Sequence, residues 1–303
     1  MDRRSGPVLV TGASSGIGRT IVQHLSEQGH EVIATARAAR DIESLGRLPH
    51  VRALRLDVTR DEEVRDVVAA LGRSGRGLYG LVNNAGIAEI VPLIDTSVDA
   101  LHRLLEVNLY GMHRMVCGCF PFLAESRGRV VNIGSTNGFL ADAFAGAYCI
   151  SKFAVEAYTD VLRAEFRDLG ISVSVVEPGD FRSNILASFV AREGNALAKR
   201  LDHSPLREAA RREIAELTES PGELDRTKYP EPEPVAEAVT DALFSMAPRP
   251  RYLVASPREV DEVMAEVFQR VRQLNEGQAH EFTIDELVER LRSATPGRSR
   301  SPS

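Results

Sequence analysis

Tyr148 and Lys152 stand four residues apart at the start of a segment, Phe153 to Leu169, whose apolar residues have helical spacing. Four residues make about one helical turn, so both side chains project from the same face of a helix. A neighbouring ammonium favours the phenolate and lowers the pKa of a tyrosine, which is ordinarily about 10. The pair is therefore suited to acid/base chemistry at a substrate oxygen. The same spacing also occurs on solvated helices that have no catalytic role.

A glycine-rich segment, Thr11-Gly12-Ala13-Ser14-Ser15-Gly16-Ile17-Gly18, follows an apolar run and opens a helix expected to reach about Gln28. Glycines let the backbone turn sharply and approach a pyrophosphate, and the free amides at a helix start favour negative charge. Many tight turns contain glycines, but this strand-turn-helix placement is the one that a nucleotide-binding motif requires. The residues expected to bind the cofactor phosphates are Gly12, Ser14, Ser15, Gly16, Ile17 and Gly18.

The end of the second predicted strand indicates which cofactor binds. There the chain has Thr35-Ala36-Arg37 in place of the acidic residue that would bind a ribose hydroxyl. Arg37 can pair with a 2′-phosphate, so we expect NADP in preference to NAD. Alternatively Arg37 is a solvated loop residue and Asp41 or another group contacts the ribose. Asp57 and Val58 are expected near the adenine, although Asp57 could instead be a turn or capping residue before the next helix.

Short β-branched runs alternate with segments of helical period along most of the chain. The predicted strands are residues 8–11, 31–35, 51–56, 80–83, 129–133, 171–176 and 252–255. Runs such as Val130 to Ile133 and Val173 to Val176 are apolar at all but one position each, which is typical of a parallel sheet buried on both faces. The sequence predicts an α/β fold: a doubly wound (Rossmann) seven-stranded parallel sheet with helices on both faces.

Residues 1–256 are expected to form one dinucleotide-binding and catalytic domain. Within it, residues 181–234 interrupt the alternation with a polar stretch that predicts a helical lid, or else a plain surface excursion. Val235 to Met246 then resumes as a helix. Residues 257–303 are expected to form a C-terminal helical extension with helices at 259–274 and 284–291 and a disordered tail at 295–303.

The totals exclude several classes of partner. Among 303 residues, 43 are acidic and 37 basic, giving a net charge of −6 and no broad positive field for nucleic acid. We expect no membrane span and no signal peptide, because no apolar run approaches 18 residues. Cys117, Cys119 and Cys149 form no spaced disulfide framework, which favours a cytoplasmic location. His113 and Cys117 are one turn apart, but Cys119 points elsewhere and no fourth ligand is near, so we expect no metal.

These motifs resemble the short-chain dehydrogenase/reductase family, in its compact single-domain branch, and within it the retinol- and hydroxysteroid-dehydrogenase-like members. The resemblance covers roughly residues 7–255 and includes the stretch Val32 to Arg37. Ser135 lies 13 residues before Tyr148 and 27 after Asn108, the intervals that the family shows. The motifs in family order are Thr11 to Gly18, Asn83-Asn84-Ala85-Gly86, Asn108, Ser135, Tyr148 with Lys152, and Pro178-Gly179.

The resemblance implies a catalytic tetrad. In the family's chemistry Tyr148 exchanges a proton with the substrate oxygen while the nicotinamide exchanges a hydride with its carbon, and Ser135 holds that oxygen. Lys152 would bind the nicotinamide ribose and lower the pKa of Tyr148, and Asn108 would hold a water that links Lys152 to solvent. Each residue has an alternative role: Ser135 could cap the following turn, and Asn108 could bridge a helix kink.

The resemblance also implies the rest of the cofactor site. Asn84, Ala85 and Gly86 follow the fourth strand, and Tyr148 and Lys152 contact the cofactor as well as the substrate. A second group, Pro178, Gly179 and Ser183, would flank the nicotinamide, with Ser183 where the family usually has threonine. Two departures from the family pattern, Cys149-Ile150 and Asp180, could shape the substrate pocket.

We therefore expect an NADP(H)-dependent oxidoreductase that interconverts an alcohol and its ketone or aldehyde, with an apolar, medium-sized substrate. Family members are often homodimers or homotetramers built on two long helices, here around Ala100 to Leu123 and Phe153 to Leu169. One alternative is a non-catalytic dinucleotide-sensing protein, although such proteins typically lose the tyrosine or the lysine. Another is an epimerase or dehydratase on the related longer fold, whose glycine spacing is usually tighter.

Overall fold

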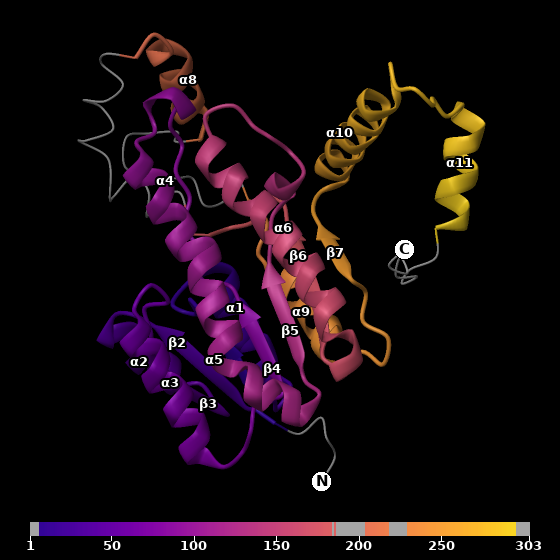
Figure 1. Cartoon of the computed structure of the whole chain (residues 1–303). Coiled ribbons are helices and arrows are strands. Elements are labelled where there is room, and N and C mark those ends of the chain that lie inside the picture. The colour runs from indigo at the N-terminus through magenta and orange to yellow at the C-terminus, as the bar shows by residue number, and fades with distance from the viewer. Residues whose placement is uncertain (1–5, 184, 186–203, 218–228, 295–303) are drawn as a thin grey trace.

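The computed structural model describes residues 6–183, 185, 204–217 and 229–294, and its centre is a seven-stranded parallel sheet of order β3-β2-β1-β4-β5-β6-β7 (Figure 1). The strands are β1 (Val8–Val10), β2 (Val32–Ala36), β3 (Val51–Arg55), β4 (Gly80–Asn83), β5 (Arg129–Ile133), β6 (Ser172–Pro178) and β7 (Arg251–Val254). The predicted doubly wound sheet is confirmed. Strand ends differ from the prediction by one or two residues, the usual uncertainty at element boundaries.

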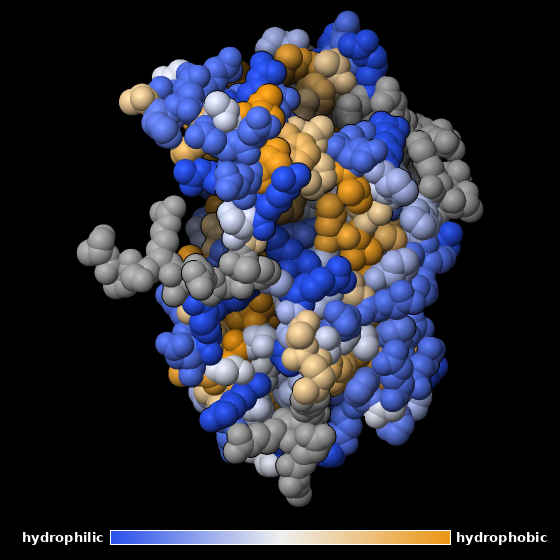
Figure 2. Space-filling view, turned by 90° about the vertical axis from the view of Figure 1, so that its right-hand side faces the viewer, coloured by the Kyte–Doolittle hydropathy of each residue, from blue (hydrophilic) through white to orange (hydrophobic). Residues whose placement is uncertain are grey.

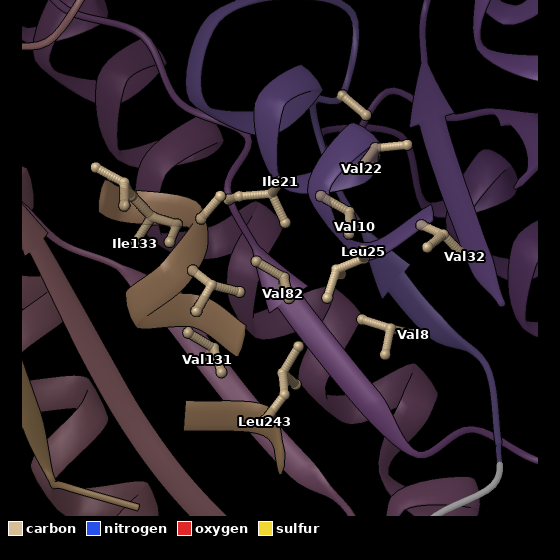
Figure 3. Close-up of a cluster of buried hydrophobic side chains, with 14 of the residues drawn as sticks. Val8, Val10, Ile21, Val22, Leu25, Val32, Val82, Val131, Ile133 and Leu243 are labelled. Atoms are coloured by element: carbon tan, nitrogen blue, oxygen red, sulfur yellow. The ribbon is translucent and has the colours of Figure 1, made fainter. Parts of the chain in front are cut away.

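Helices cover both faces of the sheet. One face carries α1 (Gly16–Glu27), α2 (Ala39–Gly46) and α9 (Glu233–Phe244), and the other carries α3 (Asp61–Ser74), α5 (Gly111–Ser126) and α6 (Gly146–Phe166). In β1, Val8 and Val10 pack into the first core, with Ile21 of α1 and Leu243 of α9 (Figure 3), whereas Leu9 packs into the second. Side chains alternate along a strand, so a strand covered on both faces is apolar at most of its positions.

The order of the strands reverses at β1. The chain runs outward from β1 to β2 and β3, then returns to place β4 on the other side of β1. The two strands therefore end side by side, with their connections leading in opposite directions, and ligands of open α/β sheets bind at such a position. At this point Asn84 donates from Nδ2 to the carbonyl oxygens of Thr11 (2.9 Å) and Gly12 (3.1 Å).

A long helical segment precedes β5. It consists of α4 (Val98–Leu105), a single π turn η2 (Glu106–Tyr110) and α5, after a short 3₁₀ turn η1 (Leu93–Asp95). Two further 3₁₀ turns are η3 (Thr136–Gly138), which follows β5, and η4 (Arg167–Leu169), which follows α6. The π turn carries Asn108 of the predicted tetrad, and Ser135 of the tetrad caps η3.

The predicted lid is described only in part. Helix α8 (Arg207–Leu217) lies within it, while residues 184, 186–203 and 218–228 lie outside the described residues. The two ends of the insertion are joined, because the Arg182 amide donates to the Pro230 carbonyl at 2.9 Å and the Arg182 side chain pairs with Glu231.

Two helices form the C-terminal extension: α10 (Pro257–Asn275) and α11 (Ile284–Ser293), both longer than predicted. Figure 2, which faces the side where they lie in Figure 1, shows hydrophobic patches among hydrophilic residues, and Phe268, Leu274 and Leu291 are exposed. The prediction of a disordered tail falls on residues 295–303, outside the described residues, as do residues 1–5. No helix in the described ranges is both long enough and apolar enough to cross a membrane.

Candidate active site

Tyr148 and Lys152 lie in the first two turns of α6, which begins at Gly146, ahead of the segment predicted from apolar spacing. The Lys152 Nζ atom lies 5.6 Å from the centroid of the Tyr148 ring, so the two side chains share a face as the spacing predicts. The Ser135 hydroxyl also acts on Tyr148, and its effect is to lower the pKa of the phenol. The structure thus brings together three of the four predicted tetrad residues.

The ionisation of this pair differs from the expectation. Burial raises the pKa of Tyr148 to about 12, with contributions from the charges of Cys149 and Asp180 and against the Ser135 hydrogen bond. Burial also lowers the pKa of Lys152 to about 8, opposed by the charge of Glu156. The Lys152 ammonium donates to the Ile133 carbonyl at 2.9 Å. Desolvation therefore outweighs the ammonium, and Tyr148 keeps its proton at neutral pH.

Ser135 is separated from β5 by Gly134 and precedes η3. Its hydroxyl accepts a hydrogen bond from the Asn137 amide at 3.2 Å and also acts on Tyr148, so the capping role and the influence on the tyrosine coexist. The turn is held to the next strand because the Gly134 amide donates to the Val176 carbonyl at 2.7 Å. The hydroxyl is consequently fixed beside the phenol.

Asn108 lies in the π turn, where it is 2% exposed. Its Oδ1 accepts from the Ile87 amide at 2.8 Å, and its Nδ2 donates to the Ile87 carbonyl and the Ser151 hydroxyl, both at 2.9 Å. The amide therefore ties the π turn to the loop after β4 and to α6 beside Lys152. Single π turns occur frequently at functional sites.

The glycine-rich turn has the geometry that a phosphate site needs. Gly12 and Gly16 have φ values of 66° and 52°, which a residue with a Cβ rarely adopts. Within the described chain, Ser15 precedes α1 without a side-chain capping bond, and the first turn, Gly16 to Arg19, contains no acidic residue. The amides at the positive end of α1 are thus available to an anion.

The turn is closed by the loop after β4. A Cβ on Gly18 would collide with the Asn84 amide and lie 2.5 Å from the Gly12 carbonyl, and a Cβ on Gly12 would lie 2.8 Å from Ala85 Cα. The Thr11 hydroxyl accepts the amides of Asn84 (3.0 Å) and Ala85 (3.1 Å). This cradle of glycines and amides fits a dinucleotide pyrophosphate. Gly86 follows it and is exposed.

The residues predicted to contact the adenosine part of the cofactor follow the carboxyl ends of β2 and β3. Arg37 is exposed, and among the described residues its guanidinium has no hydrogen-bond partner. Asp57 accepts from the Thr59 amide (3.0 Å) and hydroxyl (2.7 Å), an Asx turn. Burial raises the pKa of Asp57, but these bonds and the charge of Arg37 outweigh it, so the net shift is downward. Val58 is buried against Gly111.

The segment after β6 lies against the C-terminal extension. The Glu259 carboxylate of α10 accepts the Asp180 amide at 2.7 Å, and a Cβ on Gly179 would collide with it. Pro178 is buried, whereas Ser183 is half-buried and its hydroxyl accepts the Ile185 amide at 3.5 Å. The segment predicted to flank the nicotinamide is thus held from outside the predicted domain.

Several residues at the site were not predicted. Thr11 lies in the glycine-rich segment and Ser151 lies between Tyr148 and Lys152. The sequence does not show which buried groups their hydroxyls bind, namely the amides of Asn84 and Ala85 for Thr11 and the Asn108 side chain for Ser151. The role of Glu259 could not be predicted because the amide that it accepts, that of Asp180, is 79 residues away in the sequence. His113 and Cys117 are adjacent, with Sγ 3.5 Å from Nε2, but the described residues contain no group of three or more potential metal ligands.

Fold and site together define a Rossmann-type dinucleotide-binding chain with a Ser–Tyr–Lys group at the carboxyl edge of its sheet. Residues 7–194 match the sequence profile of the short chain dehydrogenases. The chain belongs to the short-chain dehydrogenase/reductase family, as its motifs predicted.

Individual relatives support the same placement. The chain is 41% identical over 193 residues to the mitochondrial D-beta-hydroxybutyrate dehydrogenase of Rattus norvegicus, covering 59% of this chain and 56% of that protein. It is 39% identical over 194 residues to retinol dehydrogenase 5 of Homo sapiens, covering 61% of each. The matched regions are thus less than two thirds of either relative.

A crystal structure of a short-chain dehydrogenase from Streptomyces avermitilis superposes with a TM-score of 0.71 at 29% identity. The superposition covers 90% of this chain and 95% of that one. The likeness to a retinol dehydrogenase agrees with the predicted branch, whereas the likeness to hydroxybutyrate dehydrogenases was not anticipated.

Proposed function

We propose that the protein is an NADP(H)-dependent oxidoreductase that interconverts an alcohol and its ketone or aldehyde. The observation that carries the proposal is that Tyr148, whose pKa the Ser135 hydroxyl lowers, stands one turn from Lys152 at the edge where the glycine cradle lies. When bound, the nicotinamide ring supplies or accepts the hydride. Proton transfer and binding fall to the side chains of this chain.

Tyr148 serves as the proton donor to the carbonyl oxygen in reduction, because its phenol holds a proton at pH 7. Ser135 holds the same oxygen through its hydroxyl, and two donors stabilise the negative charge that develops there. Lys152 is held by Ile133 beside the tyrosine and would bind the nicotinamide ribose.

NADP is proposed over NAD because Arg37 lies exposed at the end of β2, its guanidinium has no hydrogen-bond partner among the described residues, and no carboxylate directly follows the strand. Arg40, at the start of α2, is also exposed and adds positive charge, although it lies 3.7 Å from Asp41. A guanidinium matches the fork geometry of a phosphate. Both arginines would face the 2′-phosphate of NADP.

The substrate is proposed to be an uncharged apolar alcohol or carbonyl. The name of the human relative, a retinol dehydrogenase, supports an apolar substrate. That of the rat relative indicates hydroxybutyrate, which carries a carboxylate. The charge of Asp180 acts on Tyr148, and that of Asp142 acts on Asp180, so an anionic substrate would meet repulsion at this site.

The test is a panel of retinal, an apolar cyclic ketone and acetoacetate, followed by the absorbance of NADPH and of NADH. Oxidation of NADPH by an apolar carbonyl is the expected result. Cofactor binding without turnover of any carbonyl would favour the dinucleotide-sensing alternative. Equal kcat/KM with the two cofactors would refute the NADP preference, and turnover of acetoacetate alone would refute the substrate class.

Assembly as a homodimer or homotetramer is proposed through α5 and α6. Tyr110, Ile150, Val161 and Leu169 are exposed large apolar residues on or beside these helices. Apolar surface of this kind often marks an interface between subunits. Light scattering on the purified protein should give a multiple of 33.2 kDa, and a monomeric mass would contradict the proposal.

A cytoplasmic location is proposed from the cysteines. Cys117, Cys119 and Cys149 are all free thiols, and Cys117 is exposed. Free exposed thiols suit a reducing compartment. Cell fractionation tests this location, and recovery in an oxidising compartment would contradict it.

A further inference from the structure

Glu156 stands one helical turn after Lys152 on α6 and is 8% exposed. A carboxylate is rarely buried to this extent unless it is paired, and the pairing here comes from Arg251 of β7, 95 residues away. Residues one turn apart on a helix are neighbours, so this charge lies beside the Lys152 ammonium. It is the charge that opposes the effect of burial on Lys152.

Arg251 also pairs with two further carboxylates. Its Nη1 donates to Glu177 of β6 at 2.8 Å and its Nη2 to Asp160 of α6 at 2.7 Å. Burial raises the pKa of Glu177 to about 8, and it raises the pKa of Glu156 as well, opposed there by the charge of Arg251. Arg251 Nη1 lies closer to the Glu156 carboxylate than to that of Glu177, which favours the negative charge on Glu156. That charge is the buried counterpart of the Lys152 ammonium.

The same carboxylate packs under the turn that carries Ser135. A Cβ on Gly134 would lie 2.8 Å from Glu156 Oε1, and one on Gly138 would lie 2.9 Å from it. Glycine at these two positions therefore leaves the space that the Glu156 side chain occupies. Arg251 also stacks on Phe139, with 5.7 Å from its guanidinium carbon to the ring centroid. Lys152 holds the carbonyl of Ile133, immediately before the turn.

We propose that Glu156 is a positioning residue: held by Arg251, it fixes the turn that carries Ser135 and keeps Lys152 charged. The proposal rests on the oxidoreductase function proposed above. The titratable groups that face Lys152 and Glu156 are Tyr148 and Asp160 from α6, Glu177 from β6 and Arg251 from β7. Residues 133–139, which pack against both, contain no titratable side chain.

The chain contains only three lysines, Lys152, Lys199 and Lys228, so carbon-13 labelling at lysine Cε gives few NMR signals. The Lys152→Arg variant identifies the Lys152 signal. We expect Glu156→Gln to lower the titration midpoint of Lys152 by about one pH unit or more, because one neighbouring charge is lost in a buried site. Asp160→Asn is the matched control, since it removes a carboxylate from the same arginine one turn further away. An unchanged midpoint in Glu156→Gln, or an equal shift in Asp160→Asn, would overturn the proposal.

A second variant separates charge from position. Glu156→Asp keeps the charge but withdraws it from the turn, so the Lys152 midpoint should stay near the wild-type value. The kcat for carbonyl reduction should fall by about tenfold as Ser135 loses its support. It also remains informative where Glu156→Gln does not fold, because wild-type kcat in Glu156→Asp would refute the positioning role. If the wild type turned over no carbonyl, the proposed function would fail, while the NMR titration would still decide the charge of Lys152.

Discussion

Glu259, in the first turn of α10, accepts a hydrogen bond from the backbone amide of Asp180 at 2.7 Å. Its other oxygen accepts from the amide and hydroxyl of Ser256, at 2.8 and 2.7 Å, and completes a capping box. One carboxylate thus starts a helix of the C-terminal extension and fixes the segment after β6. The extension therefore contributes to the site.

Glu259→Ala should weaken NADPH binding by about tenfold, because the segment from Pro178 to Asp180 loses its only described anchor on α10. Loss of the helix cap should also destabilise the fold by about 0.5–2 kcal/mol. Fluorescence titration of NADPH and urea unfolding measure the two effects. Glu262→Ala is the control, because Glu262 pairs with exposed Arg258. Equal affinity in both variants would show that α10 does not support the cofactor site.

Tyr148→Phe should lower kcat/KM for carbonyl reduction by about 10²–10⁴-fold, since the proton donor is removed. NADPH affinity should change little. Tyr158→Phe is the matched control on the same helix: its hydroxyl lies 3.1 Å from His113 Nδ1, away from the site. Steady-state kinetics of both variants check the prediction, and wild-type turnover by Tyr148→Phe would exclude the proposed role.

Gly18→Ala should impair both folding and cofactor binding, because the new methyl group would collide with Asn84 and the Gly12 carbonyl. Gly72→Ala is a control within another helix: its Cβ would meet one atom of Phe122 at 3.9 Å. That change should raise stability by about 0.5–1 kcal/mol through the helix preference for alanine. Thermal unfolding with and without NADPH measures both, and equal melting temperatures would contradict the packing argument.

Arg37→Ala should weaken NADPH binding by about tenfold or more and leave NADH binding nearly unchanged. Arg47→Ala provides the control, since Arg47 is exposed on the next turns of the chain and pairs with Glu43 at 2.5 Å. Titration of each variant with both cofactors gives the comparison. A parallel loss of NADH affinity would mean that Arg37 supports the adenosine site and does not select its phosphate.

Stability should depend on pH through Glu177, whose pKa burial raises from 4.5 to about 8. Between these values the native state holds a proton that the unfolded chain releases. Its contribution to stability is therefore fully present below about pH 4.5 and is lost as the pH rises through about 8. Glu177→Gln should flatten the fall of the urea midpoint between about pH 5.5 and 7.5 relative to the wild type. Identical slopes would show that Glu177 is ionised throughout.

The sheet and the tetrad could be predicted because their signals are local. Strands such as Val130 to Ile133 are apolar at all but one position, and Tyr148 and Lys152 are separated by one helical turn. Glu156 carries no such signal: its partners Glu177 and Arg251 come from two strands that only the folded sheet places together. The direction of the Tyr148 pKa shift was also wrong in prediction, because burial acts more strongly than the neighbouring ammonium and cannot be read from spacing.

The π turn at Glu106–Tyr110 joins α4 to α5, and it determines how the side chains of α5 are rotated about the helix axis relative to those of α4. The additional residue of a π turn rotates the side chains after it by about 100° about the helix axis. The faces of α4 and α5 therefore pack against different elements, although the helical segment is continuous. Removal of a single residue there would leave the helix intact yet rotate Met115 out of the core and Asn108 away from Ser151. The region should therefore tolerate substitutions far better than changes in length.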